Sequence, residues 1–284
     1  MKKPLVAALV SLVLSVGLVS GQTRIRAPAN KYTPAQDVQL GRKAAAQVRQ
    51  QMPLVRDSVV TSYVAAIGRR LVSAVPSQFR HSGFRYTFEV VNARDINAFA
   101  LPGGPMFLNR GMIEAATNEA QVAGVMAHEL SHIVLRHGTA QASKATKYQI
   151  GTIAGAIIGS IIGGRTGTVV SEGTRIGLGT AFMRFSREFE RQADIAGAQM
   201  MARAGYDPRE MAAMFRIIAQ RGGGGGPEFL SDHPNPGNRS EYITREAKML
   251  RVSNPVRNTA GFQTVRARLR QMPPAPTMRQ IAQR

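Results

Sequence analysis

The sequence contains no cysteine. This absence excludes disulfide bonds, thiolate metal sites, a cysteine nucleophile and a lipid-modified N-terminal cysteine. A bound metal ion would therefore be held by His, Asp or Glu side chains. Acidic residues are also scarce, since 17 Asp and Glu stand against 37 Lys and Arg, which gives a formal net charge of +20. Because the basic residues are scattered along the chain, we expect a solvated surface able to associate with membranes, and no nucleic-acid partner.

Long hydrophobic runs are few, and the clearest lies at the N-terminus. Lys2 and Lys3 precede an apolar run at 5–19 that closes on small residues, which is the layout of a signal peptide. The run is shorter than the ~20 residues that cross a bilayer comfortably, so an uncleaved anchor is the weaker alternative. We predict cleavage after Gly21, so that the mature protein begins at Gln22 and is periplasmic or secreted.

Apolar residues recur at helical spacing in several segments, whereas residues 84–90 alternate apolar and polar side chains as a half-buried strand does. The helical segments cover roughly 34–51, 57–75, 118–138, 186–204 and a stretch that begins at 207. Thr33 is a predicted N-cap of the first, with Pro34 at its first helical position, and the basic C-terminal tail is expected to be helical with a Pro-rich break near 273–276. Two short extended segments flank a Pro- and Gly-containing turn at 101–105, and the first of them is suited to a sheet edge. We expect an α+β fold that is mainly helical, with a small, mostly antiparallel sheet.

The chain divides into a signal peptide (1–21), N-terminal helices (22–82), a core (83–251) and a basic C-terminal tail (252–284). The core includes an uncharged, glycine-rich segment at 150–179 and a glycine linker at 222–226. Three interpretations of 150–179 stay open: a mobile or surface-active loop near the active site, a buried helical hairpin, and a membrane-spanning helix, which the frequent glycines disfavour.

The strongest chemical signal is the sequence His-Glu-Leu-Ser-His at 128–132. On a helix, His128 and His132 lie about 40° apart, so both imidazoles can face one metal ion. Glu129 lies about 100° from His128, beside that point, where its carboxylate can take a proton from the attacking water. The alternative is a charged helix face, but these polar residues interrupt an apolar helix in which unpaired polar groups are costly.

A catalytic zinc ion needs a third protein ligand, and the remaining histidines and acidic residues are the candidates. His137 lies roughly 180° around the same helix from His128, so we expect it to face away as a surface or capping residue. His81 lies in a Ser- and Gly-containing loop without partner acids, and we interpret it as structural.

The helix predicted at 186–204 offers Glu190 and Asp194, four residues apart and on one face. This pair suggests one metal ligand and one carboxylate that accepts the outer N–H of a ligand histidine. The alternative is a pair of salt bridges with Arg187 and Arg191.

Together these segments resemble zinc metallopeptidases of family M48, the gluzincins that include the CAAX prenyl proteases, HtpX, Oma and the BepA proteins. The likeness covers about two thirds of the chain. Because the sequence shows no counterpart of the spanning helices of the prenyl proteases, the chain most resembles the soluble periplasmic members. The sequence at 190–194 matches the family's E-x-x-x-D segment, which implies that Glu190 is the third ligand of one Zn²⁺ per chain.

The resemblance also implies roles for two further segments. Asn97, Ala98 and Phe99 match the family's strand beside the active site, where substrate would bind. His233 and Arg239 match an H-P-x-x-x-x-R segment, which implies that His233 is a transition-state ligand or a switch that occupies the open zinc position at rest. Arg239 would stabilise the oxyanion.

The sequence therefore predicts a zinc-dependent endopeptidase with a zincin-type core and two ligand-bearing helices. Its edge strand near 98–101 would hold substrate by strand addition, which favours unfolded or extended polypeptides and a role in envelope protein quality control. An envelope chaperone or binding protein on the same scaffold is the second hypothesis. A basic membrane-surface or nucleic-acid protein indifferent to zinc is the third.

Overall fold

The computed structural model describes residues 21–144, 185–221, 229, 233–234 and 238–283. The predicted signal peptide lies outside these residues except for its last position, and the segments 150–179 and 222–226 lie wholly outside them. The helices are α1 (Pro34–Gln51), α2 (Ser58–Ser73), α3 (Arg110–Ala115), α4 (Glu119–Val134), α5 (His137–Lys144), α8 (Arg187–Arg203), α9 (Arg209–Arg221), α11 (Arg239–Met249), α12 (Ala260–Gln271) and α13 (Met278–Ala282), with a short 3-10 turn at Ser77–Phe79. The strands are β1 (Thr87–Val91), β2 (Ala98–Ala100) and β3 (Pro105–Asn109). Within this part of the chain, no helix has both the length and the apolarity needed to cross a bilayer.

Side-chain caps define where the principal helices begin. Thr33 caps α1 through a capping box with Gln36, with Pro in the first turn as the sequence predicts. The side chain of Asn118 accepts a hydrogen bond at the start of α4, and that of Ser186 does so at the start of α8. Gly205 follows α8 with φ +77°, a left-handed conformation that glycine adopts without strain. The mainly helical α+β fold is confirmed, although the short helix α3 was not predicted.

The sheet of the described residues has the strand order β1-β3-β2 and is mixed. β2 and β3 form an antiparallel hairpin, in which Phe99 pairs with Phe107. β1 pairs with β3 in parallel, with Val90 opposite Leu108. The expectation of a mostly antiparallel sheet is therefore wrong for one of its two pairings. The reason is topological: β2 runs opposite to β1 at the far edge, so the returning strand β3 lies parallel to β1.

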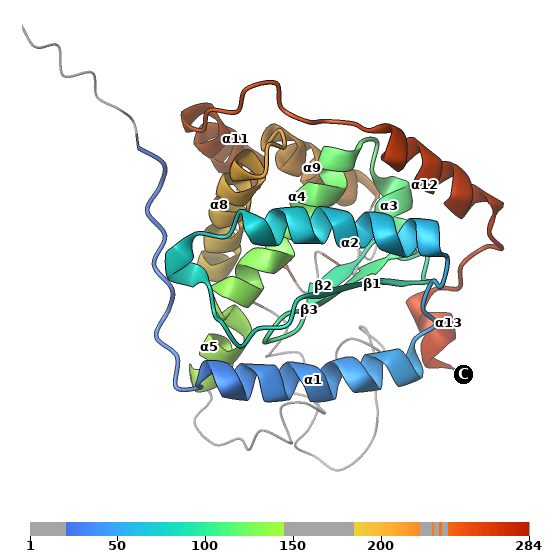
Figure 1. The fold of residues 1–284 in the computed structure, drawn as a ribbon, viewed down its shortest axis with the longest axis horizontal. Coiled ribbons are helices and arrows are strands. Elements are labelled where there is room, and N and C mark those ends of the chain that lie inside the picture. Colours follow the sequence, from blue (N-terminus) through green and yellow to red (C-terminus); the bar gives the residue numbers. More distant parts are fainter. Residues whose placement is uncertain (1–20, 145–184, 222–228, 230–232, 235–237, 284) are drawn as a thin grey trace, which may run out of the picture.

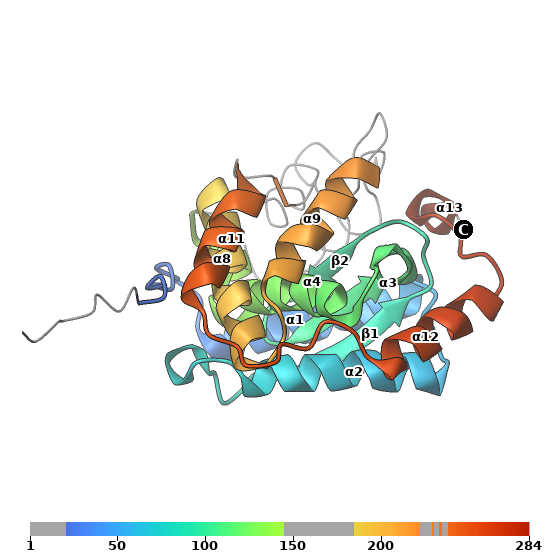
Figure 2. The ribbon, with the colours of Figure 1, turned by 90° about the horizontal axis from the view of Figure 1, so that it is seen from above.

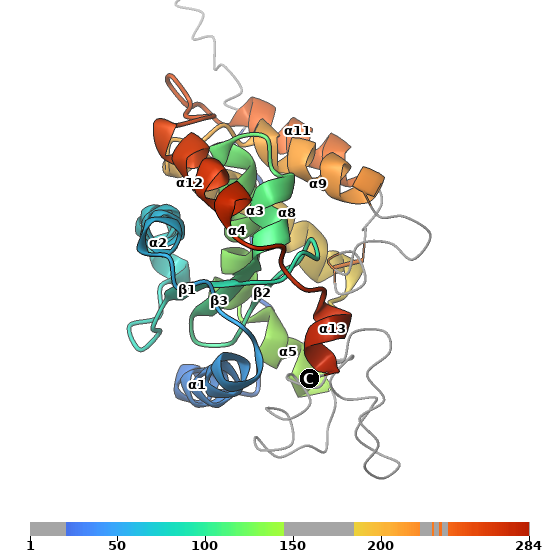
Figure 3. The same cartoon turned by 90° about the vertical axis from the view of Figure 1, so that its right-hand side faces the viewer.

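The two faces of the sheet belong to two layers of the core (Figures 1 and 3). Phe107 points to a smaller cluster that contains α1 and α13, whereas Met106 and Leu108 point to the main cluster with α2, α4 and α8. Such alternation follows from the two-residue period of a strand. The sheet therefore lies between α1 and the helical layer that carries the histidine motif.

Helix α4 is the centre of the helical layer, and all its residues are buried. α8 and α9 pack against it, α11 packs against both of them, and β2 lies beside α4 (Figure 2). Residues 252–283 also join this body, because Phe262, Val265 and Leu269 of α12 are buried in the main cluster. Helix α12 packs on α2 and α3.

Candidate metal centre and active site

Helices α4 and α8 carry the predicted metal-binding residues and lie in close contact. At Gly197 on α8, a Cβ atom would lie 3.1 Å from the backbone of Ala127 and His128, so only glycine allows this approach without displacement. The contact brings Glu190 and Asp194 of α8 to the histidines of α4, all of them buried. The helix pairing predicted from the sequence is thus present in the structure.

Four buried residues place one ligand atom each within 4.8 Å of all the others: His128, His132, Glu190 and His233. His128 Nε2 lies 3.1 Å from His132 Nε2, 3.2 Å from His233 Nδ1 and 3.4 Å from Glu190 Oε2. Ligands at 2.0–2.1 Å from a tetrahedral zinc ion are separated by about 3.3 Å. The spacing of the donors therefore fits a tetrahedral ion of this size.

Asp194 determines which nitrogen of His128 faces the cluster. Its Oδ1 lies 2.8 Å from His128 Nδ1 and accepts a hydrogen bond from it, so Nε2 is the nitrogen directed to His132 and available to a metal ion. Its Oδ2 accepts hydrogen bonds from Arg239 Nε at 2.7 Å and from the hydroxyl of Tyr242. The structure thus places Asp194 in contact with the predicted ligand His128 and adds Tyr242, which was not identified from the sequence.

Arg239 is buried and joins two carboxylates of the site. Besides Asp194, it contacts Glu190, with Nη2 2.6 Å from Oε2. Its guanidinium also lies 4.1 Å from the ring centre of Phe215. Within the described part of the chain, Nη1 is buried without a hydrogen-bond partner. Arg239 is therefore a positioning group for the carboxylates in this structure.

His137 was expected to face away from the site, and this prediction is wrong. The ring is buried, with Nδ1 3.0 Å from His132 Nδ1. The expectation assumed one helix to about residue 138, but α4 ends at Val134 and Arg136 adopts φ +59°. This left-handed residue redirects the chain, so that His137 begins α5 and points back toward α4. Arg136 is neither glycine nor asparagine, so its residue type gives no sign of a left-handed conformation.

His81, interpreted as structural, lies outside the cluster. Its Nε2 is 3.1 Å from the carbonyl oxygen of Val134, and its ring lies 4.5 Å from that of Phe84. These contacts connect the loop before β1 to the end of α4.

His233 lies between Glu129 and the other three donors. Its Nδ1 is 3.0 Å from Glu190 Oε1, and its Nε2 is 3.3 Å from Glu129 Oε1. Phe229 stacks on its ring at 4.5 Å, and Phe185 stacks on His132 at 3.9 Å. Glu129 and His233 are each only 1% exposed, so the chemistry-bearing groups are enclosed in this conformation. The two phenylalanines were not identified from the sequence, because apolar residues there are expected in any core.

The buried charges of the site do not cancel. Glu129, Glu190 and Asp194 are balanced by the single guanidinium of Arg239, which leaves two negative charges when all are ionised. Burial opposes protonation of His128, but its hydrogen bonds to Asp194 and Glu190 raise its pKa to about 9. Protonated His128 thus supplies one of the two missing positive charges, and a divalent cation that displaced this proton would supply both.

Asn97, Ala98 and Phe99, the predicted substrate-binding residues, lie at the edge strand β2 but are buried. The ring of Phe99 stacks on that of Phe107 at 5.2 Å, inside the smaller core cluster. Asn97 Oδ1 accepts a hydrogen bond from the backbone N–H of Ala98 at 2.8 Å. These side chains are thus committed to the fold, and a substrate could contact this segment only through its main chain.

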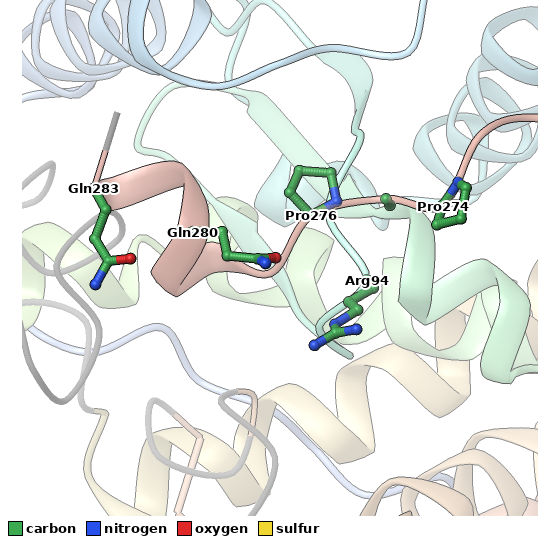
Figure 4. Close-up of a pocket in the computed structure, with 6 residues that line it drawn as sticks. Arg94, Pro274, Pro276, Gln280 and Gln283 are labelled. Atoms are coloured by element: carbon green, nitrogen blue, oxygen red, sulfur yellow. The ribbon is translucent and has the colours of Figure 1, made fainter.

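A separate pocket lies between the segment before β2 and the C-terminal residues (Figure 4). It is lined by Arg94, Pro274, Ala275, Pro276, Gln280 and Gln283. None of these residues belongs to the cluster of ligand atoms, so the pocket adds nothing to the metal centre.

Comparison with known proteins gives a consistent assignment. The model of peptidase family M48 matches residues 59–247. The chain is 31% identical over 242 residues to the beta-barrel assembly-enhancing protease of Escherichia coli K12, covering 82% of this chain and 48% of that protein. It is 30% identical over 174 residues to the mitochondrial metalloendopeptidase OMA1 of Saccharomyces cerevisiae, covering 57% of this chain and 47% of that protein. The chain thus spans about half the length of these relatives. Because the matched region includes the histidine motif, both ligand-bearing helices and Arg239, the chain belongs to peptidase family M48 of metallopeptidases.

Proposed function

We propose that the protein is a zinc-dependent endopeptidase that cleaves unfolded or misassembled proteins of the cell envelope. The observation that carries this proposal is the buried four-donor cluster with the carboxylate of Glu129 next to it. The relatives' names support it, since they describe a protease that enhances beta-barrel assembly and a mitochondrial metalloendopeptidase. The predicted signal peptide supports a periplasmic location.

His128, His132 and Glu190 are the proposed protein ligands. Their nitrogen and oxygen donors suit zinc, and their mutual distances of 3.1–3.5 Å fit its tetrahedral geometry. When bound, zinc supplies Lewis-acid polarisation of the scissile carbonyl and of the attacking water. Since catalytic zinc sites keep one position open, His233 would occupy that position in the closed conformation and move away when substrate enters.

Glu129 is the proposed general base. Its carboxylate would take a proton from water as the oxygen attacks the carbonyl carbon, then give that proton to the leaving amine as the peptide C–N bond breaks. Arg239 would hold Glu190 and Asp194 in place. Because Nε and Nη2 already contact these carboxylates, a contact with the developing oxyanion would be made by Nη1.

Strand addition at β2 is the proposed mode of substrate binding. β2 is an edge strand of the described sheet and lies beside α4, which carries the histidine motif. Main-chain pairing at this edge requires an extended substrate and no particular side chain, which favours unfolded polypeptides. The second hypothesis, an envelope binding protein with little proteolysis, has no observation that favours it over cleavage.

Association with acidic membrane surfaces is a further part of the proposal. The net charge of +20 supports it. Within the described residues, Val59 is the one large hydrophobic side chain that is exposed, at 45% of its surface. The described part of the chain would therefore bind a membrane through its charges.

The test compares purified wild type with Glu129→Gln and Glu190→Gln. We expect about one zinc ion per chain in wild type and in Glu129→Gln, and much less in Glu190→Gln. Casein, which is unfolded, should be cleaved by wild type alone, and a chelator should abolish the cleavage. A folded wild type that neither binds zinc nor cleaves casein would overturn the proposal. If Glu129→Gln still performed the cellular role, the binding-protein hypothesis would replace it.

A further inference from the structure

The ring of His137 makes two hydrogen bonds that the proposed chemistry does not use. Its Nδ1 lies 3.0 Å from His132 Nδ1, and its Nε2 lies 3.1 Å from Gln192 Oε1. The ring is fully buried and stacks on Phe189 at 4.4 Å with an angle of 2° between the planes. Its position is therefore defined both by packing and by polar contacts.

Which partner donates in each of these two hydrogen bonds can be worked out from the contact between Gln192 and Glu188. The amide nitrogen of Gln192 donates to Glu188 Oε1 at 3.3 Å, so the amide oxygen must face His137. An oxygen can only accept, which requires His137 to carry its proton on Nε2. The neutral imidazole carries a single proton, so with that proton on Nε2 the fully buried ring of His137 has an acceptor at Nδ1.

This acceptor has a consequence for His132. Because His137 Nδ1 accepts, His132 must donate from its own Nδ1, and its Nε2 is left with a free lone pair. That Nε2 lies 3.1 Å from His128 Nε2 and 3.5 Å from Glu190 Oε1. The lone pair thus points at the other proposed ligands.

We propose that His137 and Gln192 form a neutral relay that holds His132 in its metal-binding tautomer. The relay has the same effect on His132 as the Asp194 carboxylate has on His128. Gln192 and Asp194 both lie on α8. The inference rests on the proposed metal site. It assigns to His137 and Gln192 a positioning role, since neither contributes a ligand atom to the cluster.

The first experiment measures zinc affinity by competition with a chromophoric chelator. His137→Phe keeps a ring to stack on Phe189 but removes the acceptor, and we expect about 10–100-fold weaker binding. His137→Asn places an amide oxygen near the position of Nδ1 and should restore affinity to within about threefold of wild type. Gln192→Met, which changes an incompletely buried residue, should weaken binding in the same direction. Arg187→Gln, an exposed change on the same helix, is the matched control.

The second experiment needs neither metal nor activity. The chain has five histidines, so the ring nitrogens of ¹⁵N-labelled, metal-free protein can be assigned individually. Wild type should show His132 protonated on Nδ1, and His137→Phe should lose this preference while keeping the wild-type circular dichroism. His132 protonated on Nε2 in wild type, or unchanged zinc affinity in both His137→Phe and Gln192→Met, would overturn the relay. A wild type that binds no zinc would overturn the proposed function, and the tautomer spectra would still decide the relay.

Discussion

Replacing Asp194 with asparagine exchanges one oxygen for an NH2 group and hardly changes the size of the side chain. In wild type, Oδ2 accepts from Arg239 Nε and from Tyr242, while Oδ1 faces His128 Nδ1. The single oxygen of asparagine will face the two donors, so its NH2 group will face His128. His128 must then accept at Nδ1, which moves its own proton to Nε2, the nitrogen that faces the cluster.

The size of the effect follows from this change of tautomer. Loss of the hydrogen bond that orients a ligand histidine costs about 10–100-fold in metal affinity, or about 1.4–2.8 kcal/mol. Arg239 keeps Glu190 as a charged partner at 2.6 Å, so the loss of unfolding free energy should stay at about 1–3 kcal/mol. We therefore expect Asp194→Asn to fold and to bind zinc weakly.

The assay is a chelator competition titration of Asp194→Asn and wild type, with urea unfolding of the metal-free proteins in parallel. Glu241→Gln is the control. Glu241 forms an ion pair with Arg245, and their side chains are 60% and 68% exposed; such exposed pairs contribute little to the unfolding free energy. Zinc affinity of Asp194→Asn within twofold of wild type would refute the tautomer argument, whatever happens to stability.

Three other predictions concern stability and surface charge. Gly41→Ala should lower the unfolding free energy by about 1–3 kcal/mol or more in urea titrations, because its Cβ would lie 1.7 Å from the carbonyl oxygen of Pro102; full stability would contradict this contact. Burial opposes ionisation of Glu210, but hydrogen bonds from Asn118 and Arg257 hold its pKa below the ordinary 4.5. Ionised Glu210 therefore contributes fully to the unfolding free energy above pH 4.5, and this contribution is lost as the pH falls through the lower pKa of the folded state. The unfolding free energy of Glu210→Gln, measured in urea titrations at several pH values, should fall less steeply in acid than that of wild type. Mature protein should sediment with vesicles of anionic lipid at low salt and dissociate at high salt, whereas salt-independent binding would contradict an electrostatic attachment.

Local patterns in the sequence were sufficient for the parts of the site that lie within one helix. The spacing of His128 and His132 on α4, and of Glu190 and Asp194 on α8, follows from helical geometry. Thr33 and its neighbours predicted the start of α1 for the same reason, since caps are local.

Contacts between distant segments could not be predicted in this way. The turn at Arg136 is held by Asp37 through an ion pair of 2.5 Å, across 99 positions of the chain. Arginine does not favour a left-handed conformation, so the turn could not be expected from the residue type alone. The predicted direction of the His137 side chain was wrong for this reason. The contact of Tyr242 with Asp194 likewise depends on the packing of α11 against α8.

The anchoring of Arg136 bears on where the protein can be divided. Its guanidinium is held by the carbonyl oxygen of Tyr32 and by Asp37, whereas the match to the family model begins at residue 59. A fragment trimmed to that match would retain every proposed ligand and the whole relay, but not the groups that hold the turn before His137. The stretch of chain that holds the site together is therefore longer than the stretch that matches the family model. A fragment made for study should include Tyr32 and Asp37.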